Sequence, residues 1–268
     1  MPDVTVKGLS ASRPSWLRGQ VLLPILIVLI AVASTIVVVH ARSHPSAGNS
    51  SGTAIVSAAL AVVRCPTSVG ANIGPRVKMP LVLHEFLPRD LASTTSLYVD
   101  QYDAVRMVGP KGWSCVTSIA ADGGASLSIY PRGTTSPGFF KPLIGRSTAK
   151  EVTVQREPAC YACRLGLACA FFAVARQLMQ KEFPGALASC TRPRGESVTE
   201  STKYLRFFND GAGVVGHAYP SGGPYQALGV VFFNPKTVSY LVSCTLATSS
   251  RTLCRVALDW FVHYHQPI

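Results

Sequence analysis

The sequence predicts a disulfide-stabilised α+β domain, built mainly on an antiparallel sheet and preceded by one N-terminal transmembrane helix. From about residue 54 onward, short runs of β-branched and aromatic residues alternate with Gly, Pro and Asp. Two later stretches have helical periodicity, and all eight cysteines follow a long apolar segment. The chain has 268 residues, of which 48% are hydrophobic and 14% are charged. This composition excludes a disordered tail, a collagen-like fibre and a long coiled coil.

The first element is an apolar segment at 21–39, which has nineteen residues and no charge. As a helix it would span about 28 Å, enough to cross the hydrocarbon core of a membrane. Lys7, Arg13 and Arg18 precede it, and basic residues concentrate on the cytoplasmic side of such segments. We therefore expect residues 1–20 to form a cytoplasmic tail and the rest of the chain to be exported.

A cleaved signal peptide is the alternative interpretation, because the small residues around Ala41 resemble a cleavage site. The apolar part of a signal peptide runs roughly 7–15 residues, so the longer segment favours an uncleaved anchor. Residues 40–53 are small and polar and predict a flexible linker to a domain at 54–268. This domain is expected outside the plasma membrane of a single-pass protein, or to be secreted if the segment is cleaved.

Strands are predicted wherever a β-rich run lies between turn residues. Gly123 and Gly124 predict a hairpin turn between two of them. The predicted strands are 54–63, 81–86, 96–99, 114–119, 126–130, 152–155, 204–208, 213–217, 227–233 and 238–245.

Two helices are predicted, at about 165–183 and 250–263. In the first, apolar residues recur at i, i+4 and i+7, and Pro184 follows its end. In the second, Leu253, Ala257 and Phe261 belong to one apolar stripe. Late helices after a run of closely spaced strands indicate an antiparallel sheet with helices packed on it.

The even number of cysteines in an exported chain predicts a framework of up to four disulfides. A short turn between a strand and a helix would bring Cys244 close to Cys254. A pair of Cys65 with Cys115 is suggested only by chain order. The candidates are Cys65, Cys115, Cys160, Cys163, Cys169, Cys190, Cys244 and Cys254.

The motif Cys160-Tyr161-Ala162-Cys163 lies between a predicted strand and a predicted helix. A helix N-terminus lowers a thiol pKa and favours disulfide exchange, so thiol–disulfide oxidoreductase activity is one alternative. Cysteine-dense exported domains generally use their thiols as structural links, and a structural role is therefore the preferred interpretation.

Zinc is a second interpretation of Cys160 and Cys163 together with Cys169 and Cys190. Thiolate zinc sites need two closely spaced pairs, and the second pair here is twenty-one residues apart. His263 and His265 near the C-terminus have no obvious further ligands and are expected at the surface. The sequence therefore predicts no metal site and no cofactor.

An envelope hydrolase is the second enzymatic alternative. Ser147 and Lys150 match S-x-x-K, in which a lysine activates a serine, but the partner motifs are missing. His217, Ser221 and Asp210 could form a triad, although the segment HAYPSGGP around the serine is typical of a turn.

This turn is a better candidate for a binding rim, formed by His217, Ser221 and Tyr225. No catalytic residue is assigned, and the favoured function is a non-catalytic binding or structural module of the cell envelope. The chain carries +12, and the twenty-residue tail holds three basic residues and one acidic residue, so the exported part carries +10. Expected partners are the membrane itself, anionic envelope polymers or lipids, or another envelope protein, rather than nucleic acid.

Several segments resemble a group of actinobacterial envelope proteins, membrane-anchored or secreted, for which no activity is established. They are GPKGWSCVTSIAADGGASLSIYP at 109–131, the CYAC cluster at 160–163 and AYPSGGPYQALGVVFF at 218–233, followed by Cys244 and Cys254. The resemblance covers most of residues 65–258. It implies an exported location and no particular chemistry.

Overall fold

The computed structural model describes residues 54–70, 75–134, 150–213 and 225–265. All of them belong to one compact unit, Ser50–Ile268. The predicted tail, anchor and linker lie outside the described residues. No helix among the described residues has both the length and the hydrophobicity needed to span a membrane.

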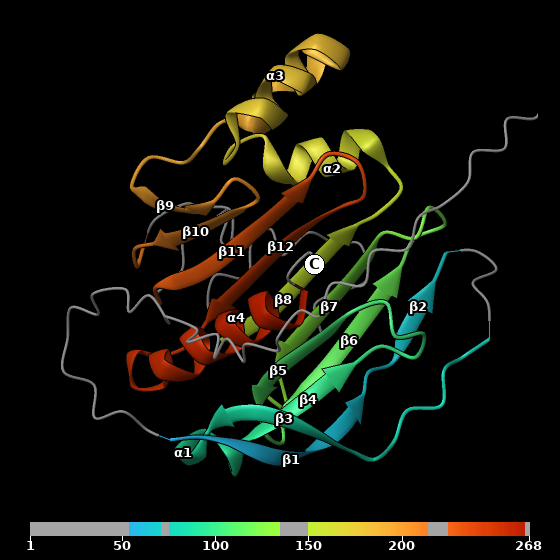
Figure 1. Cartoon of the computed structure of the whole chain (residues 1–268), viewed down its shortest axis with the longest axis vertical. Coiled ribbons are helices and arrows are strands. Elements are labelled where there is room, and N and C mark those ends of the chain that lie inside the picture. Colours follow the sequence, from blue (N-terminus) through green and yellow to red (C-terminus); the bar gives the residue numbers. More distant parts are fainter. Residues whose placement is uncertain (1–53, 71–74, 135–149, 214–224, 266–268) are drawn as a thin grey trace, which may run out of the picture. The chain divides into compact units, whose positions relative to one another are not determined.

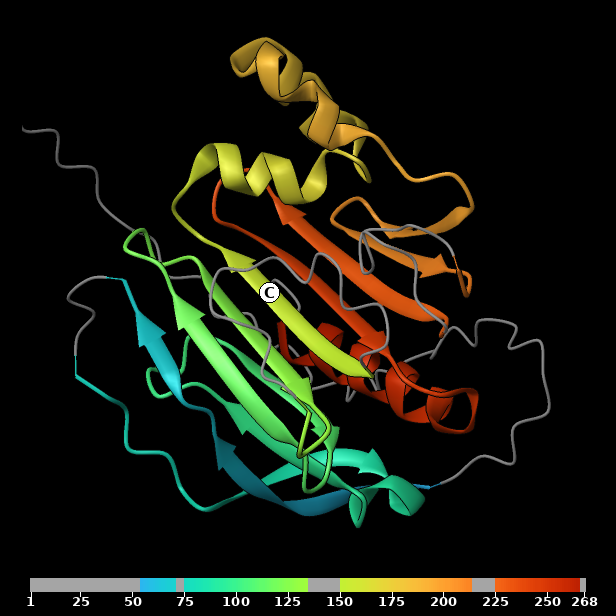
Figure 2. The ribbon, with the colours of Figure 1, turned by 180° about the vertical axis from the view of Figure 1, so that it is seen from behind.

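The larger of two sheets has eight strands, which run side by side in both views (Figures 1 and 2). In spatial order they are β2 (Thr67–Val69), β6 (Ser114–Ile119), β7 (Ala125–Tyr130), β8 (Glu151–Glu157), β12 (Val238–Thr245), β11 (Ala227–Asn234), β10 (Leu205–Asp210) and β9 (Glu196–Thr202).

The smaller sheet has four strands, in the order β3 (Val82–Pro88), β1 (Ile55–Arg64), β4 (Thr95–Val99) and β5 (Arg106–Pro110). A single turn of helix, α1 (Arg89–Ala92), follows β3. Among the described strands only the β1–β4 and β2–β6 pairs are parallel. The prediction of a mainly antiparallel α+β fold is therefore confirmed.

The two faces of the larger sheet bury different hydrophobic cores, because successive side chains of a strand point to opposite faces. In β11, Val230 and Phe232 belong to a first core together with the smaller sheet and α4 (Arg251–His265). Val231 and Phe233 belong to a second core with α2 (Tyr161–Ala168), α3 (Ala173–Glu182) and the 3-10 segment η1 (Pro184–Cys190). Both faces of the central strands are therefore covered.

The predicted helix at 165–183 is wrong as a single helix, because α2 ends at Ala168 and α3 begins at Ala173. At the break, Phe172 is extended. Its ring lies 5.4 Å from that of Phe233, and the ring of Phe171 lies 5.4 Å from that of Phe208. Burying both adjacent aromatic rings in one core outweighs the helical periodicity.

The predicted helix at 250–263 is confirmed as α4, which begins after a short 3-10 turn, η2 (Thr248–Ser250). Its last turn differs from expectation. His265 is half-buried, its ring stacks 3.9 Å from the Phe261 ring, and its Nδ1 donates a hydrogen bond to the Phe261 carbonyl at 3.0 Å. Burial lowers the pKa of His265 to about 4, so this histidine is not a surface group.

Nine of the ten predicted strands are present. In the tenth, predicted at 213–217, Gly213 lies in a turn and the remainder lies outside the described residues. The Gly123–Gly124 hairpin turn is confirmed between β6 and β7, with Gly123 at a φ of 82°. Elements that the sequence pattern did not predict are β2, α1, β5, η1, β9 and η2.

All eight cysteines are paired. The predicted pairs Cys65–Cys115 and Cys244–Cys254 are both confirmed. The first joins the end of β1 to β6, and so links the two sheets, while the second joins β12 to α4. The remaining pairs are Cys160–Cys163 and Cys169–Cys190.

Candidate functional site

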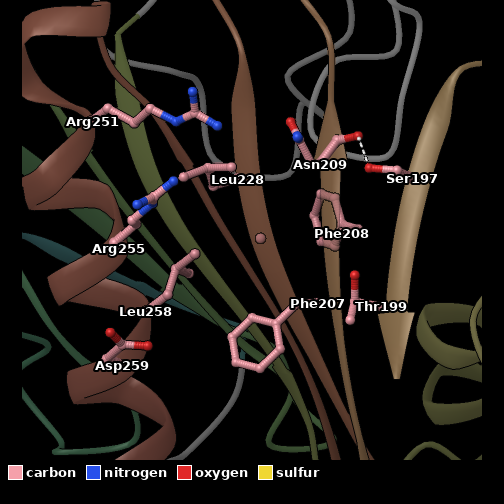
Figure 3. A pocket seen from close by; sticks show the side chains of 11 residues that line it. Ser197, Thr199, Phe207, Phe208, Asn209, Leu228, Arg251, Arg255, Leu258 and Asp259 are labelled. Atoms are coloured by element: carbon pink, nitrogen blue, oxygen red, sulfur yellow. Dashed lines mark hydrogen bonds between the residues drawn. The ribbon is translucent and has the colours of Figure 1, made fainter. Parts of the chain in front are cut away.

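A groove with a volume of about 330 Å³ lies between α4 and the outer strands of the larger sheet (Figure 3). Because α4 packs on β11 and β12, strands β9 and β10 extend beyond it and form the opposite wall. The lining residues are Ser197, Thr199, Phe207, Phe208, Asn209, Leu228, Gly229, Arg251, Arg255, Leu258 and Asp259.

The helical wall follows from the spacing of residues along α4. Arg251, Arg255, Leu258 and Asp259 are separated by four, three and one residues, so they share one side of the helix. The neighbouring stripe, which includes Ala257 and Phe261, is buried in the first core. The amphipathic helix therefore places two guanidinium groups in the groove while its apolar stripe is held in the core.

The strand wall is polar at one end and aromatic at the other. Ser197 and Thr199 alternate along β9 and face the groove, as do Phe207 and Asn209 along β10. The Ser197 hydroxyl donates a hydrogen bond to the Asn209 carbonyl at 3.4 Å (Figure 3). Gln226 donates to Oδ1 of Asn209 at 2.5 Å, which fixes the side-chain amide.

The charged side chains of the groove differ in their hydrogen-bond and charge partners. Nε of Arg251 is buried and has no hydrogen-bond partner among the described residues. Burial raises the pKa of Asp259, and the Arg255 guanidinium opposes that rise. An anion in the groove could accept hydrogen bonds from the Arg251 and Arg255 side chains that line it, because a guanidinium donates readily to carboxylates and phosphates.

Gly229 leaves room for the Phe208 ring at this site. It lies directly opposite Phe208, and a Cβ atom at 229 would be only 2.0 Å from Cζ of the Phe208 ring. The ring therefore lies over the glycine and closes the sheet beneath the groove.

The CYAC motif forms the most accessible disulfide. Cys160 is the N-cap of α2, and its Sγ accepts a hydrogen bond from the Cys163 amide at 3.2 Å. Cys160 is half-buried and Cys163 is exposed. The other six cysteines, Cys65, Cys115, Cys169, Cys190, Cys244 and Cys254, are each at most 7% exposed. A soluble thiol would therefore reach this pair before any other.

The surroundings of this disulfide are also defined. Arg164 donates hydrogen bonds to the Pro158 and Ala159 carbonyls and holds the loop that precedes the motif. The Asp122 carboxylate lies within 4.8 Å of both sulfurs. The helix N-terminus favours a thiolate here, whereas the carboxylate disfavours one. Because the four cysteines of the zinc interpretation form two separate disulfides, that ligand set is not assembled.

Three buried acidic residues, Glu151, Asp210 and Glu196, lie in one cross-strand row. The row is on the face of the larger sheet opposite α4. Glu151 pairs with Thr245, Thr245 with Ala227, Ala227 with Asp210, and Asp210 with Glu196. Glu151 is 4% exposed, and burial raises its pKa to about 7, against a hydrogen bond from Ser128 that lowers it. The row lies at the end of the sheet from which the connection between β10 and β11 leaves and to which it returns.

The whole predicted rim, His217, Ser221 and Tyr225, lies on that connection. His217 and Ser221, and Ser147 of the S-x-x-K match, lie outside the described residues. Asp210 is fully buried in β10. Tyr225 is half-buried, with the Lys150 ammonium 5.7 Å from the centre of its ring.

Sequence reasoning missed Arg251 and Arg255. Their i, i+4 spacing beside the apolar stripe of the predicted helix was visible, but the opposite wall comes from β9, which was not predicted. The residues of that wall, Ser197 and Thr199, lie in the mostly exposed and polar run ESVTEST, which has no apolar alternation.

No protein-family model and no curated protein matches the sequence. In structure, the chain is similar to cyanobacterial PsbP (CyanoP) from Synechocystis sp. PCC 6803, with 12% sequence identity and a TM-score of 0.31. The match covers 62% of this chain and 91% of that chain. At this TM-score the likeness defines no function for this chain.

Proposed function

We propose that this chain is a membrane-anchored binding module of the cell envelope, and that the groove beside α4 takes an anionic ligand. The observation that carries the proposal is the pair of guanidinium groups, Arg251 and Arg255, facing hydroxyl and amide groups across the groove. Cationic groups with a few convergent hydrogen-bonding side chains are typical of sites for carboxylates and phosphates.

The predicted topology supports the same function. The apolar segment at 21–39 with basic residues before it favours an anchor with the domain outside the cell. Four disulfides suit an oxidising compartment. In the envelope, ligands with these groups include acidic sugars and phosphate-bearing polymers, and the +10 of the exported part would favour their approach.

The test is calorimetric titration of the full chain in detergent with glucuronate and, separately, inorganic phosphate. We expect binding of at least one anion, and a loss of about tenfold or more in affinity in R251Q/R255Q, because charge-assisted hydrogen bonds contribute most. The comparison of the two anions distinguishes a carboxylate from a phosphate ligand.

The matched control is R192Q/R194Q, which also removes two positive charges, from two exposed residues before β9. It should change the affinity less than about twofold. Equal losses in both variants would mean that net charge alone attracts the anion. That result, or no binding of either anion to the unchanged chain, would overturn the proposed groove.

A second candidate function is thiol–disulfide exchange, favoured by the exposure of Cys160–Cys163. A thiolate of a partner dithiol would attack one sulfur, forming a mixed disulfide and releasing the other cysteine as a thiolate. The second partner thiol would then displace the first cysteine. The partner dithiol loses two electrons and becomes a disulfide, and Cys160 and Cys163 become the dithiol.

Graded reduction separates this candidate from a purely structural role. In glutathione buffers of decreasing potential, followed by alkylation and mass mapping, we expect Cys160–Cys163 to open about tenfold faster than the three buried disulfides. C169S/C190S, which removes a buried pair, should leave that rate unchanged. The redox candidate is abandoned if Cys160–Cys163 opens no earlier than the buried pairs.

A further inference from the structure

The outward face of the smaller sheet carries a concentration of exposed apolar side chains. Of the seven large hydrophobic side chains exposed among the described residues, only Val174 and Tyr264 lie elsewhere in the chain. The other five lie in β1, in β3 or in the segment leading into β3: Ile55, Val77, Leu81, Val82 and Phe86. Exposed apolar clusters of this kind mark surfaces that contact a partner or a membrane.

The register shows which of these residues share a face. Ser57 lies opposite Phe86, Ala59 opposite His84, and Ala61 opposite Val82, and these side chains alternate with the buried residues of both strands. With Ile55 they define the β1–β3 face: Ile55, Ser57, Ala59, Ala61, Val82, His84 and Phe86. Phe86 is 68% exposed and Ile55 is 62% exposed.

The face extends toward α4 and has a free edge. A groove of about 560 Å³ between β3 and α4 continues it, lined by Ile55, Phe86 and Trp260 among others. The Trp260 indole donates a hydrogen bond to Glu85 at 2.9 Å, which holds α4 against β3. β3 is one of the two edge strands of the smaller sheet. Strands β1 and β3 lie at the end of the domain away from α3 in both views (Figures 1 and 2).

The charges beside the face differ between its two sides: basic side chains lie in the segment that leads into β3, whereas Glu85 and Asp259 line the groove toward α4. Arg76 and Lys78 are exposed in the segment that also carries Val77 and Leu81. Arg89 and Asp90 are both exposed in α1, so their charges offset each other. Apolar side chains flanked by basic ones are the combination that inserts into the interface of an anionic bilayer.

The connection of the domain to the predicted anchor also favours the membrane as the surface that this face contacts. The predicted anchor ends at residue 39, and β1 begins at Ile55, so the fifteen residues 40–54 separate them. A flexible linker of that length has a root-mean-square span of about 20 Å. Ile55 would stay near the bilayer surface, where the effective concentration of lipid makes even a weak contact persist.

We propose that the β1–β3 face docks on the anionic lipid surface of the membrane that holds the anchor, with Phe86, Ile55 and Val82 entering the headgroup region and Arg76 and Lys78 contacting lipid phosphates. The inference is independent of the anion groove. It orients the domain, because the face that holds α3 then lies away from the bilayer.

The test uses the full chain in nanodiscs that hold one copy each, made of phosphatidylcholine with a minority of phosphatidylglycerol. Two variants each add one tryptophan at an exposed apolar position: F86W on the β1–β3 face and V174W on α3. With brominated acyl chains, we expect the added fluorescence of F86W to be quenched about threefold more than that of V174W. R76Q/K78Q in the F86W background should reduce the quenching when phosphatidylglycerol is present and leave it unchanged without it.

Each other result decides against the proposal. Equal quenching of F86W and V174W would show that the face stays in water. If R76Q/K78Q leaves the quenching of F86W unchanged, Arg76 and Lys78 do not contact lipid phosphates. A blue shift of F86W that appears in discs loaded with two copies and not in discs with one, with no dependence on bromine, would assign the face to a second copy of the chain.

Discussion

Replacing both Cys65 and Cys115 by alanine is expected to lower the free energy of unfolding by about 4 kcal/mol. The disulfide closes a loop of 50 residues, and the loss of chain entropy in the unfolded state grows with loop length. It also adds a cross-link between the two sheets to the backbone connections, since Cys65 follows β1 and Cys115 lies in β6. Urea unfolding of the full chain in mild detergent, followed by tryptophan fluorescence, measures the change.

The control for this prediction is C160A/C163A. That disulfide spans three residues, so its removal should cost only about 1–2 kcal/mol by the same loop argument. If the two double variants lose equal stability, loop closure does not explain the contribution of Cys65–Cys115.

Replacing Glu151 by glutamine is expected to stabilise the protein at neutral and alkaline pH by up to about 3 kcal/mol. The pKa of Glu151 is about 7 in the fold, against an ordinary value of 4.5, because burial disfavours the charged carboxylate. The native state therefore holds its proton more tightly than the unfolded chain does. Stability falls as pH rises from about 4.5 to 7 and then levels off.

E151Q cannot ionise, so its stability should show a flatter dependence on pH across this window, and it should match the unchanged chain most closely below pH 4.5. Urea midpoints at several pH values between 4 and 8 test this. The matched variant is E157Q: burial also raises the pKa of Glu157, to about 6, but this residue is only half-buried and water screens its charge. Its effect should be smaller. If stability depends on pH as steeply in E151Q as in the unchanged chain, Glu151 does not cause this dependence.

Local sequence signals predicted much of the fold. The nine confirmed strands have apolar residues at the spacing that a half-buried or buried strand needs, and Gly123 supplies the positive φ of the β6–β7 turn. Cys244 and Cys254 lie only ten residues apart, so a strand, a short turn and a helix suffice to pair them. Each of these features depends on neighbours in the chain.

Other elements had no such signal. β5 contains only five residues, and two of them are Gly109 and Pro110, which usually indicate a turn. β9 lies at the edge of the larger sheet and is mostly exposed, so no apolar alternation identifies it. The break between α2 and α3 follows from the packing of Phe171 and Phe172 against distant strands, which a local pattern does not contain.

The sequence by itself determined the α+β class of the fold, because residue periodicity is a property of the chain read in order. The membrane topology and the export of the domain stay predictions from apolar length and cysteine count. Only the tertiary structure decided which residues meet. Ser197 and Arg251, which lie on opposite walls of the groove beside α4, are more than fifty residues apart, and Cys65 and Cys115 join separate sheets. It also separated the three buried disulfides from Cys160–Cys163, because solvent exposure depends on the packing of the whole domain.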